Sequence, residues 1–169
     1  MKKIGIFFGS STGVTESVAE LIGDKLAVAG DNIKDVSRIE SEELLNYDLL
    51  VLGASTWGDG DIQDDWYDAL DEIKVLDLSN KQVALFGCGD SASYPDTFCD
   101  GVGELYEALQ DTGCSFVGLV STSDYEYDNS TAEKEGEFVG LLLDEDNESD
   151  KSEERIINWV KQLKREVQL

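Results

Sequence analysis

Residues 3–20 read KIGIFFGSSTGVTESVAE, and the character of the chain changes twice within them. The apolar run at residues 3–8 is typical of a buried strand, and apolar side chains from Val14 to Leu26 then recur at helical spacing. The junction between the two carries four hydroxyl residues around Gly13. A strand, a tight loop and an amphipathic helix in this order indicate an α/β protein.

The alternation of strands and helices continues to the end of the chain. Further strands are expected at 32–36, 49–54, 82–88 and 115–120, with a weak helix at 40–45. Later helices are expected around three apolar sets: Trp66, Leu70 and Ile73; Val102, Leu105 and Leu109; and Ile156, Val160, Leu163 and Val167. Five nearly continuous apolar strands predict a parallel sheet with helices on both faces, in a single domain spanning residues 1–169.

One polar, turn-rich segment interrupts this pattern. Residues 121–137 read STSDYEYDNSTAEKEGE. The FVGLLLD that follows resumes the strand character of the SFVGLV before it. A loop of this length in a compact domain is usually functional or disordered. We therefore expect an insertion of about 20 residues that splits the last strand.

Composition excludes several classes of function. The chain has 37 acidic and 13 basic residues and a net charge of −24, which opposes nucleic-acid binding and favours partners with basic patches. It has no histidine, which excludes histidine-dependent nucleophiles and histidine-ligated metals. Cys88, Cys99 and Cys114 are too few for a four-thiolate cluster, and their odd number favours reduced thiols in a cytoplasm. No stretch reaches transmembrane length, so a soluble cytoplasmic protein without a metal is expected.

Parallel sheets of this kind bind ligands beyond the carboxyl ends of their strands, which draws attention to the loop after Phe8. That loop offers four hydroxyls, a flexible Gly13 and the unpaired amides at the start of a helix: a phosphate site built from neutral donors. The hydroxyls belong to Ser10, Ser11, Thr12 and Thr15. No Lys or Arg lies between Lys3 and Lys25, which excludes a Walker A motif. The alternative is a Ser/Thr-rich helix cap without a ligand.

Two aromatic residues stand in the loops after the third and fourth strands. Trp57 lies in STWGDGDIQDDW (55–66) and Tyr94 in GDSASYPDTFC (89–99). A single loop aromatic is more often a packing anchor. Two of them on neighbouring loops beside a phosphate loop predict a planar ring held between them. The predicted ligand is a monophosphate joined to a flat ring system.

Four motifs together resemble the long-chain flavodoxins over essentially the whole chain: residues 5–20, 55–66, 86–100 and 138–150. The resemblance implies a flavodoxin-like doubly wound three-layer sandwich. Its five-stranded parallel sheet has the order 2-1-3-4-5, and its fifth strand is split by the insertion. Flavodoxins are among the proteins from which the switch-point rule is known, with FMN bound between the first and third strands.

The resemblance also implies the FMN-binding residues. Ser10, Ser11, Thr12, Gly13, Val14 and Thr15 would bind the phosphate, Trp57 and Tyr94 would cover the two flavin faces, and Cys88, Gly89, Asp90 and Cys99 would meet the pyrimidine edge. Thr56 and Asp146 would lie near the ribityl chain, Gly58 beside N5 and Asp59 near N1, and Ser55 completes the set. Val14 stands where some relatives have Lys, and Gly58-Asp59 where some have bulkier pairs. Cys88 and Cys99 occupy positions often held by Thr and Gln.

The implied function is a low-potential one-electron carrier, not an enzyme, that shuttles between semiquinone and hydroquinone in place of ferredoxin. Gly58 tolerates the positive φ that a peptide flip beside N5 requires, which would stabilise the semiquinone. Full reduction places an anion near flavin N1, and nearby carboxylates would repel it and lower the potential of the second reduction. They belong to Asp59, Asp61, Asp90 and Asp146. One carboxylate about 10 Å away costs roughly 1.7 kcal/mol, on the order of 70 mV for one electron.

An acidic monomer of this kind would dock on redox proteins with basic faces. Candidates are a ferredoxin–NADP reductase, photosystem I, nitrogenase reductase and pyruvate oxidoreductase. One alternative is an FMN-dependent quinone or azo reductase of the same fold, whose hydride access Tyr94 would block. Another is a phosphate-acceptor signalling domain, which needs an acidic cluster where this chain has Gly9, Ser10 and Ser11.

Overall fold

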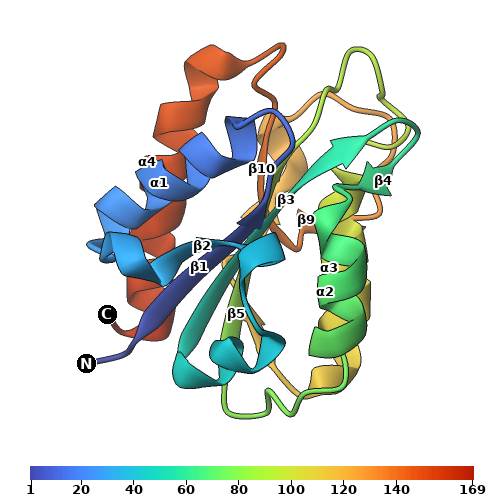
Figure 1. Ribbon diagram of the computed structural model, residues 1–169. Coiled ribbons are helices and arrows are strands. Elements are labelled where there is room, and N and C mark those ends of the chain that lie inside the picture. The colour runs from blue at the N-terminus through green and yellow to red at the C-terminus, as the bar shows by residue number, and fades with distance from the viewer.

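A computed structural model describes residues 1–169 as a central sheet between two layers of helices (Figure 1). The main strands are β1 (Ile4–Gly9), β2 (Ile33–Asp35), β3 (Leu49–Trp57), β5 (Gln82–Cys88) and β10 (Gly140–Leu143), with short β4 (Asp61–Ile62) and β6 (Ser115–Val117) at the sheet's margins. The α-helices are α1 (Val14–Leu26), α2 (Asp65–Ile73), α3 (Asp100–Leu109) and α4 (Ser149–Val167). Short 3-10 helices are η1 (Gly30–Asn32), η2 (Val36–Arg38), η3 (Ser41–Asn46), η4 (Gln110–Thr112) and η5 (Thr122–Asp124).

The parallel strands lie in the order β2-β1-β3-β5-β10, which confirms the predicted order 2-1-3-4-5. Helices α1 and α4 cover one face of this sheet, and α2 and α3 cover the other (Figure 1). β2 lies on one side of β1, and β3, β5 and β10 follow in order on its other side, so the strand order switches between β1 and β3. The loops that follow β1 and β3 therefore leave toward opposite faces of the sheet, and in sheets of this kind a crevice lies between two such loops.

Alternation along the strands divides the interior into two cores. Phe7 belongs to the core under α2 and α3, whereas its neighbour Phe8 belongs to the core under α1 and α4. Successive strand side chains point to opposite faces, so a strand buried on both sides must be apolar at every position. This explains why LLVLGA and QVALFGC carry no charge.

The fifth strand position is filled by two separate pieces of chain. β6 pairs with Gln82–Ala84 at the start of β5, and β10 pairs with Leu85–Cys88 at its end. The segment between the two pieces forms a small antiparallel sheet of β7 (Val120–Ser121), β9 (Glu137–Phe138) and β8 (Glu133–Lys134). The predicted insertion is confirmed, but its limits are wider than 121–137. Phe138 pairs with Val120 in the small sheet and is not part of the resumed strand.

The insertion has an aromatic core of its own. Phe138 is fully buried, and its ring centroid lies 4.9 Å from Tyr125 and 5.2 Å from Tyr127. Phe98, which comes from the loop after β5, joins this cluster at 5.8 Å from Tyr127. A polar sequence thus folds on a few aromatic contacts, and these contacts attach it to the rest of the domain.

Four predicted elements differ from the structure. The strand expected at 115–120 ends at Val117, because Gly118 has left-handed backbone (φ +77°) and Val120 pairs with Phe138 in the small sheet. The strand expected at 49–54 continues to Trp57, because its end pairs with β4 in a hairpin. The strand expected at 32–36 is only Ile33–Asp35. The weak helix at 40–45 is a 3-10 helix, Ser41–Asn46, with a capping box in which the Glu40 and Glu43 side chains each accept from the other's backbone amide. Six residues leave few α-helical hydrogen bonds to form, which favours the tighter turn.

Candidate functional site

The carboxyl ends of four parallel strands meet at one edge of the sheet. Gly9 is in register with Ala54, and Cys88 is in register with both Ser55 and Leu143. The loops that follow β1, β3, β5 and β10 therefore leave the sheet side by side (Figure 1). The predicted site residues all lie in these loops or at the strand and helix ends that border them. Sequence positions 10 to 146 are thus brought to one edge.

The loop after β1 presents a group of backbone amides without acceptors. The amides of residues 11, 12, 14, 15 and 16 donate to no protein atom, whereas Gly13 N donates to Ser10 Oγ at 3.0 Å. Gly13 caps α1 at φ +91° without a side-chain cap, and no atom lies within 4 Å of the position that a Cβ would take there. A helix N-terminus in this arrangement attracts an anion.

Thr15 supplies a polar atom that no protein group satisfies. The residue is 1 % exposed, and its Oγ1 has no hydrogen-bond partner of normal geometry. A buried hydroxyl without a hydrogen-bond partner reduces the free energy of unfolding by about 1–3 kcal/mol. Such groups are rare in folded proteins, and each one calls for an explanation such as a ligand. Nearby Cys88 adds no charge, because burial raises the pKa of its thiol to about 12. Free amides and an orphaned hydroxyl fit a phosphate.

Trp57 lies at the end of β3 and not in a loop, contrary to the prediction. Trp57 pairs with Asp61 across the β3–β4 hairpin, and its Nε1 donates to Ser55 Oγ at 2.9 Å. The turn between them needs left-handed backbone at Gly58 (φ +51°) and Gly60 (φ +104°). The indole is held by regular backbone pairing while 42 % of its surface remains exposed. A rigid, exposed ring of this kind is suited to stacking.

Tyr94 stands on the loop after β5 and is 43 % exposed. Its amide donates to Asp90 O at 2.9 Å, and Ser93 N donates to Asp90 Oδ1 at 3.0 Å, so the loop is closed on itself. The Ser93 amide is also the main reason why the pKa of Asp90 is lowered. The amides of Asp90 and Cys99 have no protein acceptor and remain available at the predicted pyrimidine edge.

The side chains of Cys88 and Cys99 point into the protein. Cys88 packs in the core under α1 and α4, and Cys99 in the core under α2 and α3. Cys99 holds left-handed backbone at φ +53°, and burial raises the pKa of its thiol. The Thr56 hydroxyl accepts from Gly101 N at 2.9 Å. Any ligand contact at the two cysteines is therefore left to their backbone.

A network of carboxylates ties the loop after β5 to the loop after β10. Asp144 is fully buried and accepts hydrogen bonds from the amide and hydroxyl of Ser91. Asn147 Nδ2 donates to Asp90 Oδ1 at 2.8 Å and to Asp144 Oδ1 at 2.9 Å. Burial, followed by the charges of Asp90 and Asp144, raises the pKa of Asp146. The site edge is therefore acidic and shares one neutral donor between two carboxylates.

Sequence reasoning missed the residues that support this site from behind. Ser91, Asp144 and Asn147 are three of them, and Gln63, which donates to Ser11, is the fourth. The only signal in the sequence was a neutral amide among acidic neighbours: Gln63 lies two residues after Asp61 and directly before Asp64 and Asp65, and Asn147 lies between Asp146 and Glu148. No periodicity distinguishes such residues from solvated loop positions.

The insertion supports the Tyr94 loop from its outer side. The amides of Asp128 and Asn129 both donate to Pro95 O at 2.9 Å, and Phe98 N donates to Asn129 O at 3.2 Å. Thr131 N donates to Asp100 Oδ1 at 2.8 Å. The loop after β5 is thus hydrogen-bonded on both flanks.

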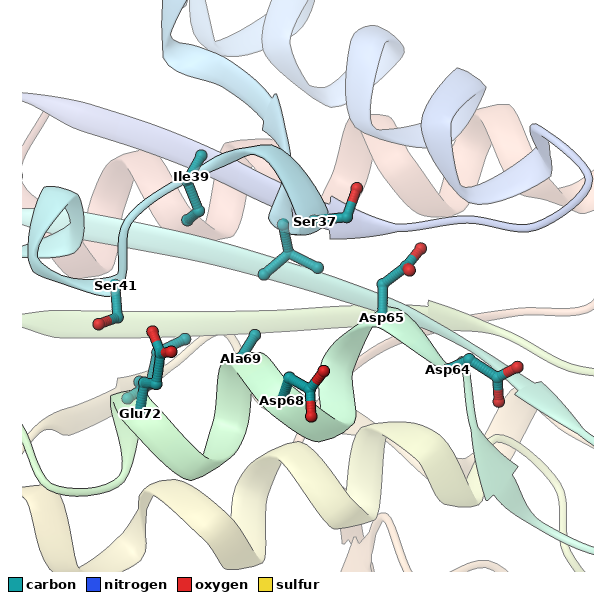
Figure 2. A pocket seen from close by; sticks show the side chains of 10 residues that line it. Ser37, Ile39, Ser41, Asp64, Asp65, Asp68, Ala69 and Glu72 are labelled. Carbon is teal, nitrogen blue, oxygen red and sulfur yellow. The ribbon is translucent and has the colours of Figure 1, made fainter.

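A separate cavity of about 270 Å³ lies between α2 and the 3-10 segments that follow β2 (Figure 2). Figure 2 shows carboxylates of α2 and its N-terminal flank along this groove, at Asp64, Asp65, Asp68 and Glu72. Its lining contains no basic residue, so the groove would repel a phosphate. This groove therefore does not compete with the carboxyl edge of the sheet as a phosphate site.

The chain matches the family described as flavodoxin over residues 6–159. It is 45% identical to the flavodoxin of Nostoc sp. over 168 residues, which is 99% of each chain. It is 40% identical to flavodoxin 1 of Azotobacter vinelandii, with 98% of each chain covered. The crystal structure of Fusobacterium nucleatum flavodoxin bound to flavin mononucleotide has a TM-score of 0.90 at 31% identity, covering 98% of this chain and 99% of that one. No helix of the chain is both long and apolar enough to cross a membrane.

Proposed function

This chain belongs to the flavodoxin family, and on that basis we propose that it is a one-electron carrier that works with non-covalently bound FMN. The observation that carries the proposal is the set of unpaired amides at residues 11, 12 and 14–16, together with the buried Thr15 hydroxyl, beside two half-exposed aromatic rings. These are the donors and the stacking surfaces that a flavin monophosphate needs.

The residues fit the parts of FMN as follows. Ser10 to Thr15 would hold the phosphate through neutral donors, which suits a dianion because the donors are already aligned by the fold. Trp57 and Tyr94 would enclose the ring, and the free amides of Asp90 and Cys99 would meet its pyrimidine edge. FMN supplies the one-electron chemistry when it is bound.

The protein's own charges favour a low reduction potential. Asp90, Asp144 and Asp146 lie together at the site edge, and Asp144 is fully buried. The site loops hold no Lys or Arg to offset them. Adding negative charge beside these carboxylates is costly in a medium of low dielectric. We infer a carrier that works on the second, low-potential one-electron couple, in the place that a ferredoxin takes elsewhere.

The positive φ of Gly58 supports control of the potential of the first one-electron couple as well. Gly58 lies next to Trp57 in the tight turn of the hairpin, and the nearest atom to its Cβ position, Asp61 Oδ2, is 3.7 Å away. Its peptides have room to turn, and Gly can take either backbone hand. A turned carbonyl beside the flavin would accept a hydrogen bond from the protonated ring nitrogen. This bond would stabilise the half-reduced state.

The net charge of −24 supports electrostatic docking on redox partners with basic faces. We propose the classes expected from the sequence: a ferredoxin–NADP reductase, photosystem I, nitrogenase reductase or pyruvate oxidoreductase. A cytoplasmic monomer is part of the same proposal. Electron transfer to a basic acceptor should slow by tenfold or more between about 10 mM and 500 mM salt, because surface charges are screened. A rate independent of salt would contradict this docking mode.

The deciding experiment is a flavin titration followed by stepwise reduction. Flavin-free protein should quench the fluorescence of FMN at a one-to-one ratio. Thr15→Val, which removes only the orphaned hydroxyl, should weaken binding roughly tenfold. The matched control is Thr112→Val, whose buried hydroxyl donates to Leu109 O far from the site. Bound FMN should then be reduced in two separate one-electron steps, whereas a single two-electron step would favour the quinone or azo reductase.

A further inference from the structure

Gln63 is a buried polar residue in the short connection between β4 and α2. It is 2 % exposed, and its backbone amide donates to Ser55 O at 3.0 Å. That bond fixes the base of the side chain to the end of β3. The motifs of the sequence assign Gln63 no role, and the site described above gives it only a hydrogen bond to Ser11.

Every polar group of the Gln63 side chain has a partner. Its Nε2 donates to Asp65 Oδ2 at 2.7 Å and to Ser11 Oγ at 3.3 Å, while its Oε1 accepts from Asp65 N at 3.1 Å. An amide nitrogen has two hydrogens, so both of its bonds can form at once. Asp65 lies in the first turn of α2 at the acidic groove (Figure 2). The amide therefore connects the start of α2 to the phosphate loop.

The backbone at Gly9 makes room for this arrangement. A Cβ at Gly9 would overlap Gln63 Oε1 and would approach Trp66 Cδ1 to 2.7 Å. Trp66 is itself fixed, because its Nε1 donates to Gly53 O at 2.9 Å. The residue just before the phosphate loop thus has no side chain, and Gln63 occupies that space.

The direction of the bond to Ser11 has a chemical consequence. Because the Ser11 oxygen accepts from Gln63, its own hydrogen must point away from Gln63. The unpaired amides of residues 11 and 12 lie at the same loop. A phosphate held by those amides would meet an oriented O–H donor, with no cation needed.

We propose that Gln63 is a positioning residue that turns the Ser11 hydroxyl into a donor for the phosphate of the bound flavin nucleotide. This inference rests on the proposed function. An amide is required at position 63, because a carboxylate would lie against Asp65 and would accept the Ser11 hydrogen. The bond between positions 63 and 11 would then run in the opposite direction, and the hydroxyl would be lost to the phosphate.

The experiment compares two ligands that differ only by the phosphate. Full-length flavin-free protein is titrated with FMN and with riboflavin, with fluorescence quenching as the readout. Gln63→Glu should raise the dissociation constant for FMN roughly tenfold or more and leave that for riboflavin within about twofold. Ser11→Ala, at an exposed position, should give a similar selective loss. The double variant should lose no more than Gln63→Glu alone, because both changes remove one interaction.

The matched control is Gln162→Glu, which adds the same charge on α4. Gln162 also donates to a carboxylate, Glu166 Oε1 at 2.8 Å, and it lies outside the site. The affinity of the Gln162→Glu variant for both flavins should be unchanged. Equal losses for FMN and riboflavin in Gln63→Glu would overturn the inference, as would unchanged FMN binding or losses that multiply in the double variant. If the unaltered protein binds neither flavin, the proposed function falls as well, so the two failures can be told apart. Should Gln63→Glu fail to fold, Ser11→Ala and Gln63→Leu test the inference instead. The readout is again the ratio of the dissociation constants for FMN and riboflavin.

Discussion

Glu104 on α3 accepts a hydrogen bond from the backbone amide of Ile62 at 3.3 Å, so a carboxylate holds the hairpin that presents Trp57. Burial, followed by the charges of Asp61 and Asp100, raises the pKa of Glu104, although the Ile62 amide acts in the opposite direction. The folded protein therefore retains a proton at Glu104 at pH values where the unfolded chain has released it. The contribution of this group to stability must then fall as pH rises through the range above its ordinary value of 4.5.

We expect Glu104→Gln to stabilise the protein at pH 7, because an amide oxygen can still accept from Ile62 but carries no charge. The gap in urea midpoint between variant and unaltered protein should close below the ordinary glutamate range, where Glu104 is neutral in both states. Unfolding curves between pH 4 and pH 8 measure the gap. Glu153→Gln, at an exposed position on α4, controls for the loss of one charge. A gap that does not change with pH would refute the assignment.

The hairpin turn offers a second prediction. Gly60→Ala should destabilise the protein by more than about 2 kcal/mol, because φ is +104° and the new Cβ would lie 2.8 Å from Asp100 Oδ2. Gly58→Ala should cost only about 1 kcal/mol, since its φ is +51° but its surroundings are open. Gly30→Ala is the control, with no positive φ and no atom within 4 Å. Urea unfolding of flavin-free protein should rank the three, and a Gly60 variant as stable as the Gly30 variant would contradict the strain.

A third prediction concerns the donor shared by Asp90 and Asp144. Asn147→Ala should cost about 1–3 kcal/mol, because it takes a hydrogen bond from a fully buried carboxylate. It should also release the loop after β5, so amide hydrogen exchange at Ser91, Ser93 and Tyr94, which are hydrogen-bonded in this loop, should accelerate. Asn158→Ala, at an exposed position on α4, should change stability by less than about 0.5 kcal/mol. Unaltered exchange at Ser91, Ser93 and Tyr94 would show that Asn147 does not restrain the loop.

The parts of the fold that local pattern decides were predictable. The helix expected from Val14 to Leu26 has those bounds in the structure, because apolar spacing and Gly13 are properties of the segment itself. The extension of β3 to Trp57 was not predictable, because it depends on pairing with Asp61 and Ile62. The same holds for Gln63, which reads as a solvated loop residue but is 2 % exposed, beside Gly9 and hydrogen-bonded to Ser11 and Asp65.

The candidate site divides along the same line. Ser10 to Thr15, Trp57 and Tyr94 could be placed at one edge because parallel strands end together. The inward direction of the Cys99 side chain could not, because it follows from left-handed backbone at φ +53° at the start of α3. Acidic loops conceal their supporting residues, since burial of one carboxylate among many leaves no trace in composition. Asp144 is an example: it is fully buried, whereas Asp146, two residues later, is exposed.

A final prediction tests whether the insertion supports the Tyr94 loop through its aromatic core. Phe138→Ala should cost about 3–5 kcal/mol, because the ring is fully buried against Tyr125, Tyr127 and Phe98. Protease cleavage within residues 121–137 should become faster than in the unaltered protein, and exchange at Asp128 and Asn129, whose amides donate to Pro95 O, should accelerate with it. Tyr67→Ala removes an aromatic residue that is 46 % exposed on α2 and should leave both rates unchanged. If cleavage accelerates while the amides of Asp128 and Asn129 stay protected, the insertion holds the Tyr94 loop through its backbone bonds alone, without the aromatic core.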